Sequence, residues 1–413
     1  MSTERFFTRP WVIRRLYEGP LATHVDGFAA RLSDHGFARS TAQRQIRIVA
    51  ELSRWMNRRD LTVSDLGKET IDAFLDSRRK SRRLGYAYDA TLRMLTDYLR
   101  GAGLIAAPVQ QPTDSEQDPI LGAFQEYLEQ ERGLSAPTIA NHLRVTRRFL
   151  GSLRDSGAGE FSQLRAEHIA DFFLSQTQHT GWQHAKSVAT TLRAFLRFLR
   201  LRGAIATDLG ACIPHVHTRH LATLPKFLGR EQVELLLKHC NRGTARGRRD
   251  FAILLLLARL GLRAGEVVAM SLDDIDWEAG ELVVHGKGPR TSRLPLPSDV
   301  GSAIAEYLLR DRPRCSSRRV FIRAKAPYEG FSRPIAIGHI MRRTLARAGL
   351  HPPCTGAYVL RHTLATQMLQ QGASLTEIGQ ILRHRRQDTT TIYAKVDLSK
   401  LQEVAQPWPG GES

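Results

Sequence analysis

The sequence is poor in the residues that mark several classes of protein. It contains only four cysteines, and none of them forms a CxxC pair. Neither a disulfide framework nor a zinc ribbon is therefore indicated, and a reducing cytoplasm is expected. The longest apolar run, Phe251 to Ala258, is too short for a membrane-spanning helix, which needs about 20 residues. Residues 1–21 lack a continuous apolar stretch, so no secretory signal peptide is expected.

Acidic residues are also outnumbered. The 413 residues include 41 Asp and Glu against 60 Lys and Arg, which gives a net charge of +19. The electric field of a protein with this positive charge attracts polyanions, so nucleic acid is the expected partner. Most of the basic residues are arginines, whose planar guanidinium binds phosphate through two hydrogen bonds at once. A basic protein associated with the ribosome is the alternative that charge alone leaves open.

One segment gathers side chains that often bind metals. Residues 212–220 contain one cysteine and three histidines. Their spacing is not a familiar zinc-ligand pattern, and the segment adjoins a predicted linker. We therefore expect no metal site here, and nothing in the sequence indicates a cofactor.

Composition divides the chain into three segments. Residues 106–119 are rich in proline, glutamine and acidic residues, which is typical of an interdomain linker. Helical periodicity lapses and prolines recur between residues 210 and 225. The predicted organisation is a helical domain at 1–106, a linker at 107–118, a second helical domain at 119–210, a linker at 211–223, a third domain at 224–404 and a tail at 405–413.

The first two segments resemble each other. GFARST at 36–41 matches GLSAPT at 133–138, IDAF at 71–74 matches IADF at 169–172, and YLRGAG at 98–103 matches FLRLRG at 198–203. Helical bundles in general share some features. Three matches in the same order, at an offset that drifts only from 97 to 100 residues, favour duplication of a whole domain.

The second segment predicts two amphipathic helices with basic faces. Ser135 and Pro137 favour a helix start, and apolar residues follow at helical spacing there and again between Val188 and Leu199. The basic residues could form only a solvated face. The high net charge favours contact with DNA phosphates, which would position DNA without reading its sequence. The candidate DNA-binding residues are Arg144, Arg147, Arg148, Lys186, Arg193 and Arg197.

The third segment mixes helices and strands. Residues 231–240 and 248–260 have helical patterns, and the second helix is expected to stop at Gly261. Residues 275–277, 281–284 and 292–296 are short predicted strands that form a meander. Helices resume after Val300. The expected fold class is mainly α with a small antiparallel β-meander.

Two positions beside the meander could bind a phosphate. Arg263 follows the predicted helix stop and opens a new helix, whose N-terminus favours an anion. Glu266 lies one turn later and could hold the guanidinium. Lys287 lies at a hairpin turn between two glycines, which allow a close approach to another backbone. Taken singly, these are more often a structural arginine and a solvated lysine.

The densest group of reactive side chains lies further along the chain. The motif YVLRH contains Tyr358, Arg361 and His362, and it is followed by His384 in LRH and Tyr393 in TTTIY. These residues could form a hydrogen-bonded core network. Together they also supply what cleavage of a phosphodiester needs: a nucleophile, cations around the non-bridging oxygens, and an acid for the leaving oxygen.

At these motifs the chain resembles the tyrosine recombinase, or phage integrase, family. The family pattern is an Arg, a Lys in a β-hairpin, a His-x-x-Arg pair, a His or Trp, and a terminal Tyr. The resemblance spans the third segment, and the second segment is similar to the family's helical core-binding (SAM-like) domain. The residues that match the catalytic pattern are Arg263, Lys287, Arg361, His384 and Tyr393.

The resemblance implies a mechanism. Tyr393 attacks a DNA phosphate and forms a 3′-phosphotyrosine with a free 5′-hydroxyl. Arg263 and Arg361 hold the phosphate oxygens, His384 adds a hydrogen bond, and Lys287 protonates the leaving 5′-oxygen. The ester conserves the bond energy, so neither ATP nor metal is needed.

The resemblance also implies partners. These are double-stranded DNA and either a homo-tetramer on it or a complex with related recombinases. Beyond Tyr393, residues 398, 401 and 404 have helical spacing, and this tail is expected to dock on a neighbouring protomer.

One position departs from the family pattern. Tyr358 stands where the family has the His of His-x-x-Arg. A phenol with a pKa near ~10 is a poor base at neutral pH. Tyr358, at this position, and Glu266, beside Arg263, are additional candidate site residues.

The preferred hypothesis is a site-specific recombinase of a mobile element. The alternatives are a catalytically weakened or inactive DNA-binding accessory protein and a strand-swivelling topoisomerase, and the duplicated helical segment speaks against the latter.

Overall fold

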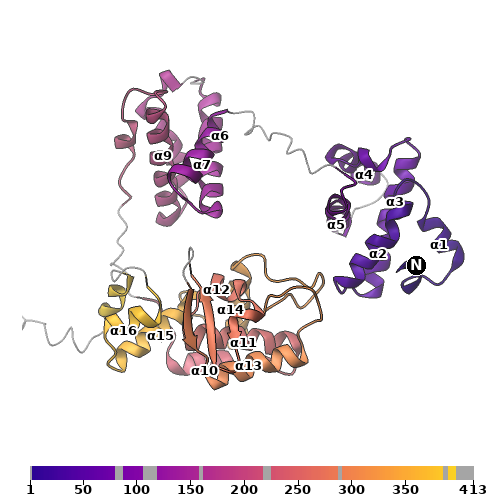
Figure 1. The fold of residues 1–413 in the computed structure, drawn as a ribbon. Coiled ribbons are helices and arrows are strands. Elements are labelled where there is room, and N and C mark those ends of the chain that lie inside the picture. The colour runs from indigo at the N-terminus through magenta and orange to yellow at the C-terminus, as the bar shows by residue number, and fades with distance from the viewer. Residues whose placement is uncertain are drawn as a thin grey trace, which may run out of the picture. The chain divides into compact units, whose positions relative to one another are not determined.

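The computed structural model describes residues 2–79, 87–105, 119–157, 161–216, 225–286, 291–384 and 389–396. These residues are mainly helical and contain one three-stranded antiparallel sheet, so the predicted fold class is confirmed (Figure 1). Within these ranges, no helix is both long and apolar enough to span a bilayer.

The α-helices are α1 (Pro10–Leu16), α2 (Val25–Asp34), α3 (Arg39–Asn57), α4 (Lys68–Arg79), α5 (Ala87–Gly101), α6 (Pro119–Glu126), α7 (Ala136–Asp155), α8 (Ala166–Thr177), α9 (Trp182–Leu201), α10 (Arg230–Lys238), α11 (Ala245–Leu260), α12 (Ala264–Ala269), α13 (Ser298–Arg310), α14 (Ile335–Arg347), α15 (Tyr358–Gln370) and α16 (Leu375–Ile381). The strands are β1 (Ile275–Asp276), β2 (Glu281–His285) and β3 (Thr291–Pro295). Short 3-10 or π segments are η1 (Ser2–Arg5), η2 (Ala22–His24), η3 (Val63–Asp65), η4 (Tyr127–Glu131), η5 (Phe161–Gln163), η6 (Leu209–Cys212), η7 (Leu272–Asp274) and η9 (Thr391–Val396).

The first and second helical regions have the same order of elements. α3, η3, α4 and α5 in the first correspond to α7, η5, α8 and α9 in the second. Gly36 and Gly133 precede α3 and α7 with φ values of 72° and 55°, and Gly103 and Gly203 follow α5 and α9 with φ of 70°. A left-handed backbone favours glycine. Both regions therefore use glycine-dependent turns at matching places.

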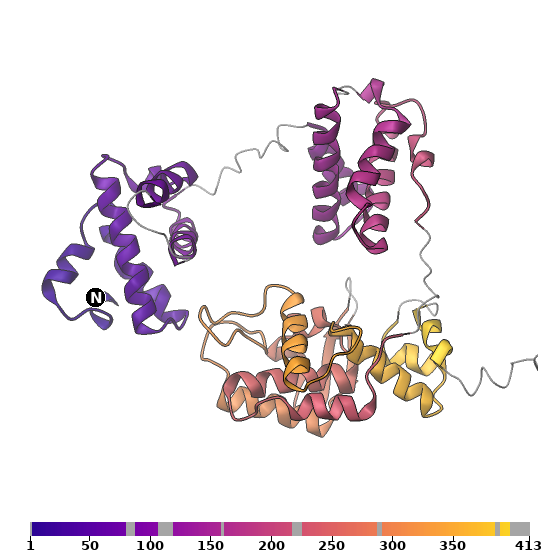
Figure 2. The same ribbon diagram turned by 180° about the vertical axis from the view of Figure 1, so that it is seen from behind.

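The second region is a helical bundle around its own core. Ser135 is the N-cap of α7 and a proline lies in its first turn, as the sequence predicts. α7 and α9 pack against each other and lie side by side in both views (Figures 1 and 2). Ile213 is buried in the same core, so residues packed into this region extend past the start of the linker predicted at 211. Apolar residues at helical spacing on α7 and α9 are buried in this core: Ile139, Leu143, Phe149, Leu150, Leu153, Val188, Leu192, Phe195 and Leu199.

The third region contains the sheet. Its order is β1-β2-β3, and the β2–β3 pairing runs from Glu281 opposite Pro295 to His285 opposite Thr291. The strands agree with the predicted ones to within a residue. α11 carries the longest apolar run through the centre of this region. It begins three residues before the predicted position because the Thr244 side chain accepts a hydrogen bond from the Gly247 amide at 3.1 Å.

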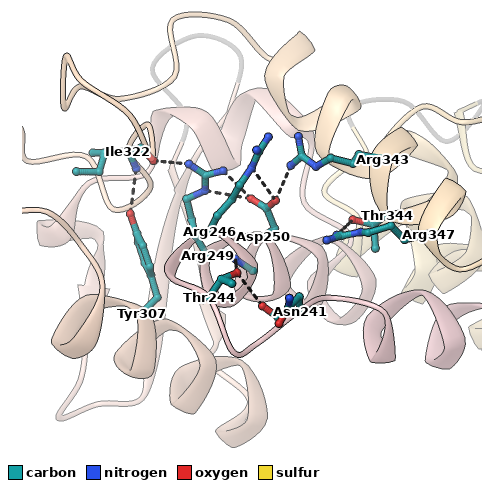
Figure 3. A network of polar contacts seen from close by, with 11 residues as sticks. Asn241, Thr244, Arg246, Arg249, Asp250, Tyr307, Ile322, Arg343, Thr344 and Arg347 are labelled. Atoms are coloured by element: carbon teal, nitrogen blue, oxygen red, sulfur yellow. Dashed lines mark hydrogen bonds and ion pairs between the residues drawn. The ribbon is translucent and has the colours of Figure 1, made fainter. Parts of the chain in front are cut away.

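A buried carboxylate fixes the start of α11 (Figure 3). Asp250 is 1% exposed, and its two oxygens accept hydrogen bonds from Arg249 at 2.7 Å and from Arg343 on α14 at 2.6 Å. Arg246 forms a longer ion pair with the same side chain at 4.0 Å. Arg249 also donates to the Ile322 carbonyl at 2.8 Å. A buried charge is tolerated only when it is paired, so this network joins α11 to α14.

Candidate active site

The end of α11 is tied to α15 and α16 by one arginine. α11 stops at Gly261, whose φ is 57°, and the chain turns toward Arg263. Arg361 on α15 donates Nη1 to the Gly261 carbonyl at 2.5 Å and Nη2 to the Leu382 carbonyl. Burial, together with the charges of Arg263 and Arg383, lowers the pKa of Arg361 to about 10. Arg361 therefore remains a cation at neutral pH.

Glu266 holds two further guanidinium groups. Arg263 donates Nη1 to Glu266 Oε1 at 2.7 Å, and Arg383 donates Nη2 to Oε2 at 3.0 Å. Burial opposes ionisation of Glu266, but the hydrogen bonds from Arg263 and the charges of Arg383 and Arg263 outweigh it and lower the pKa. The Arg263 side chain is still 47% exposed. Three arginines thus surround one carboxylate, which leaves positive charge for an anion.

Tyr393 lies in a small apolar cluster between α15, α16 and η9. It is 1% exposed and packs with Ala365, Leu369, Ile378 and Leu382. Burial raises the pKa of its phenol to about 12, although the charge of Arg361 opposes this. The phenol therefore carries its proton at neutral pH.

Two histidines flank the Tyr393 ring. The Tyr393 hydroxyl is 2.8 Å from Nδ1 of His362. The His384 ring lies nearly parallel to the tyrosine, with centroids 6.4 Å apart and planes 6° apart, and its Nδ1 is 2.7 Å from Thr390 Oγ1. Burial, then the charges of Arg361 and Arg263, lower the pKa of His384 to about 4. His384 is therefore neutral at physiological pH.

The structure brings together four of the five residues that match the catalytic pattern. Arg361 lies within electrostatic reach of Arg263 and Tyr393, and His384 lies within reach of both arginines. Arg263 follows the end of α11 and precedes the other three by at least 98 residues (361 − 263 = 98). Arg361 lies in the first turn of α15, His384 follows α16, and Tyr393 lies in η9. Lys287 lies outside the described residues. The catalytic roles of all five remain predictions.

Tyr358 occupies a different environment. It is 51% exposed at the start of α15, and its hydroxyl contacts Cys354 Sγ. That hydrogen bond, with burial, raises its pKa to about 12. Its ring meets the His362 ring edge-on, with centroids 5.5 Å apart. His362 thus contacts both tyrosine rings, while the hydroxyl of Tyr358 is directed to a cysteine.

Three residues of this site make contacts that the sequence did not predict. They are His362, which contacts Tyr393; Arg383, which pairs with Glu266; and Thr390, which contacts His384. His362 and Arg383 directly adjoin residues of the catalytic pattern, and His362 lies one helical turn after Tyr358. Their places beside these residues were the available signal in the sequence. Adjacency along the chain does not show which side-chain atoms come into contact.

The six candidate DNA-binding residues divide into two groups. Arg193 is half-buried and donates to the carbonyls of Ile213 at 2.9 Å and Pro214 at 3.2 Å. It therefore fastens the chain that follows η6 to α9. Five are exposed on α7 or α9: Arg144, Arg147, Arg148, Lys186 and Arg197. Their contact with DNA remains a prediction.

No group of three or more metal-binding side chains occurs in the described parts of the chain. Of the histidine-rich segment 212–220, residues 217–220 lie outside those parts.

Comparison with known proteins identifies the class. Residues 226–400 match the model of the phage integrase family, and residues 121–203 match its N-terminal SAM-like domain. The chain is 43% identical to the integrase/recombinase y4rA of Sinorhizobium fredii over 98% of both proteins. It is 30% identical to the tyrosine recombinase XerD of Corynebacterium glutamicum over 69% of this chain and 94% of that protein.

The fold agrees with solved structures of the same kind. A lambda integrase tetramer bound to a Holliday junction matches with a TM-score of 0.52 at 14% identity, over 76% of this chain and 87% of that one. Fold and sequence thus define a DNA breaking and rejoining enzyme. The chain belongs to the phage integrase family of tyrosine recombinases.

Proposed function

We propose that this enzyme is a site-specific recombinase that cleaves and rejoins DNA of a mobile element through a 3′-phosphotyrosine at Tyr393. The observation that carries the assignment is the position of the Tyr393 phenol. It lies beside a neutral histidine and within reach of the charge of Arg361. A phenol so placed can become a nucleophile when a phosphate enters the surrounding positive charge.

The arginines supply the electrostatic part of the reaction. Arg263 is partly exposed and held by Glu266, so its remaining donors are oriented without being consumed. Arg361 is held rigidly by two backbone carbonyls. Preorganised cations of this kind stabilise charge that develops on phosphate oxygens in the transition state. His384 adds a hydrogen bond, and Lys287 protonates the leaving 5′-oxygen.

The Tyr393 phenol also has to become accessible to DNA. It is 1% exposed, so the side chains that cover it keep a DNA backbone away. We infer that DNA binding or contact with another protomer shifts these covering side chains, and that a phosphate then reaches the phenol while its hydroxyl stays beside Nδ1 of His362.

Double-stranded DNA is the proposed partner. The net charge of +19 and the exposed basic residues of α7 and α9 support phosphate contacts in the second region. Exchange of strands between two duplexes requires several active sites, so we propose a homo-tetramer on DNA or a complex with related recombinases. We propose that the second region, predicted at 119–210, contacts DNA and that the third region, predicted at 224–404, cleaves it. The proposed location is the cytoplasm.

The first helical region is proposed to be a duplicate of the second. The shared order of elements and the matching positive-φ glycines support this. A second copy of a bundle that binds DNA would contact additional DNA beside the cleavage site or a neighbouring subunit.

A nicked DNA substrate tests the nucleophile. Overlapping nicked duplexes that tile the DNA on both sides of the gene trap a covalent intermediate, because the short strand beyond the nick diffuses away. We expect the wild type and Tyr358→Phe to form a protein–DNA adduct on denaturing gels, and Tyr393→Phe to form none. Adduct formed by Tyr393→Phe would reject the assignment of the nucleophile. Absence of any wild-type adduct would favour a DNA-binding accessory role instead.

A further inference from the structure

In the described parts of the chain, the Tyr393 hydroxyl has one side-chain hydrogen-bond partner, which is His362. Its Nδ1 lies 2.8 Å from the phenol oxygen, and the ring centroids are 5.6 Å apart. Because Tyr393 is protonated, the phenol donates and Nδ1 accepts. The neutral imidazole must then carry its own proton on Nε2.

A phenol with a raised pKa requires a proton acceptor before it can attack phosphorus. The other basic groups nearby are already engaged. His384 Nδ1 bonds to Thr390, and Glu266 accepts from Arg263 and Arg383. The hydroxyl of Tyr358 contacts Cys354, so this side chain does not reach Tyr393.

The surroundings keep His362 able to accept a proton. Burial, then the charge of Arg361, lower its pKa below the ordinary value, so the ring is neutral at physiological pH. The other ionisable groups that face this cluster are Tyr358 on the same helix, Tyr393, His384, Arg263 and Arg383. The arginines oppose the imidazolium that forms, and the negative charge of an entering DNA phosphodiester offsets their charge. The histidine would therefore gain basicity when DNA occupies the site.

We propose that His362 is a catalytic residue of the cleavage reaction, the general base that takes the proton of the Tyr393 hydroxyl. This inference rests on the proposed function. The phenol O–H bond breaks, its proton moves to Nδ1 of His362, and the phenolate oxygen forms a bond to phosphorus. The bond from phosphorus to the 5′-oxygen breaks, and that oxygen takes a proton from a separate acid. In rejoining, the 5′-hydroxyl returns its proton to the group that served as the separate acid, and the 5′-oxygen attacks phosphorus. The departing phenolate then recovers its proton from His362.

His362→Asn separates basicity from hydrogen bonding. The asparagine Oδ1 can occupy nearly the position of Nδ1 and accept from the phenol, but it does not take up a proton at neutral pH. We expect adduct formation on the nicked duplex to slow by roughly 10²-fold or more, the usual contribution of general base catalysis. The wild-type rate should fall as the pH is lowered and His362 is protonated. His362→Asn should lose that dependence.

His362→Ala provides an independent test, because added imidazole can replace the missing base. We expect imidazole to increase adduct formation by His362→Ala in proportion to its unprotonated fraction, and to leave wild type and Tyr393→Phe unchanged. His239→Asn, at the exposed end of α10, is the matched control and should cleave like wild type. Thermal melting and DNA retention on gels confirm that each variant is folded. If the alanine variant does not fold, the pH profile of His362→Asn still tests whether His362 is the general base.

The outcomes are distinct. The wild type could form adduct while His362→Asn cleaves at a similar rate with the same pH profile. That result would overturn the role of His362 and leave the proposed function intact. Folded His362→Ala that is slow but insensitive to imidazole would also overturn it. A wild type that forms no adduct on any tile would remove the proposed function, and this inference with it.

Discussion

Tyr358 and Tyr393 show how the environment separates two chemically identical side chains. Both phenols have a raised pKa, but one is half-exposed and bonded to Cys354, and the other is buried beside His362. The structure thus gives a physical reason for choosing Tyr393, which the motif position alone suggested. With His362 as the proposed proton acceptor, a tyrosine at 358 is compatible with proton transfer from Tyr393.

Replacing Tyr358 by His tests this interpretation. We expect Tyr358→His to form adduct on the nicked duplex at least as fast as the parent, because the imidazole retains an aromatic contact with His362 and adds a second base. Cleavage rates of the two proteins under single-turnover conditions provide the measurement. Complete loss of cleavage by a folded variant would show that the phenol at 358 has a function of its own.

The two half-buried histidines, His362 and His384, predict how stability depends on pH. His384 has a pKa of about 4 in the folded protein, and that of His362 is also lowered, against about 6.5 when unfolded. As the pH falls below about 6.5 the unfolded chain binds protons that the folded site refuses, so stability falls until the folded pKa is reached. Glu266, whose pKa is lowered, retains its contribution above about 4.5 and loses it only in stronger acid.

We therefore expect the melting temperature to decrease between pH 7 and pH 5. His384→Asn should decrease less over that interval than the wild type, whatever its stability at pH 7. His239→Asn should decrease as much as wild type. An equal pH dependence in wild type and His384→Asn would show that His384 is not held neutral by the fold.

At the scale of single elements, helix ends rather than helix faces build the site. α11 stops at Gly261, α12 starts after Arg263, and the end of α16 leads directly to His384. The Gly261 carbonyl is left free by the helix stop and accepts from Arg361. Backbone carbonyls that a helix leaves unpaired at its end thus hold the Arg361 side chain.

Gly261→Ala should disturb this arrangement. The residue has φ of 57°, and an added Cβ would lie 2.7 Å from Leu382 Cδ2 and 3.0 Å from Leu364 Cδ2. We expect a loss of about 1–3 kcal/mol in the free energy of unfolding from strain and crowding, together with slower cleavage. Denaturant titration and adduct formation measure the two effects.

Gly338→Ala is the control for this change. Gly338 lies inside α14 with no atom within 4 Å of the added Cβ, so the substitution should stabilise by about 0.5–1 kcal/mol. A Gly261→Ala protein as stable as wild type would mean that the stop at the end of α11 adapts freely.

At the scale of the whole molecule, the excess of positive charge is the dominant property. Each phosphate neutralised on duplex DNA adds about −0.9 to the slope of log affinity against log salt concentration. Exposed arginines on α7 and α9 contribute to that slope only if they touch DNA. Arg193, which is bound to two carbonyls, should act mainly through the packing of the second region.

We expect Arg144→Ala and Arg148→Ala each to weaken binding of an arbitrary duplex and to make the salt slope shallower by about 1. Fluorescence anisotropy over a range of salt concentrations provides the slope. Arg193→Ala should instead lower the melting temperature. A slope unchanged in both exposed variants would place the DNA on another face of the protein.

Much of the fold could be predicted from short-range patterns. The three strands, α10, α11 and the start of α7 follow from periodicity, from Gly261 and from the capping at Ser135, all of which act over a few residues. The burial of Ile213 and the hydrogen bonds of Arg193 to the carbonyls of Ile213 and Pro214 could not be predicted, because they depend on how the chain after η6 packs against α9. Neither contact leaves a mark in the local sequence.

The sequence by itself determined the family, the net charge and the identity of the reactive side chains, because these are properties of residue types and their spacing. Only the tertiary structure decided that His362 meets Tyr393, that Arg383 shares Glu266 with Arg263, and that Tyr358 contacts Cys354. Hydrogen bonds act over about 3 Å, and which atoms come that close depends on how helices distant in the chain pack together.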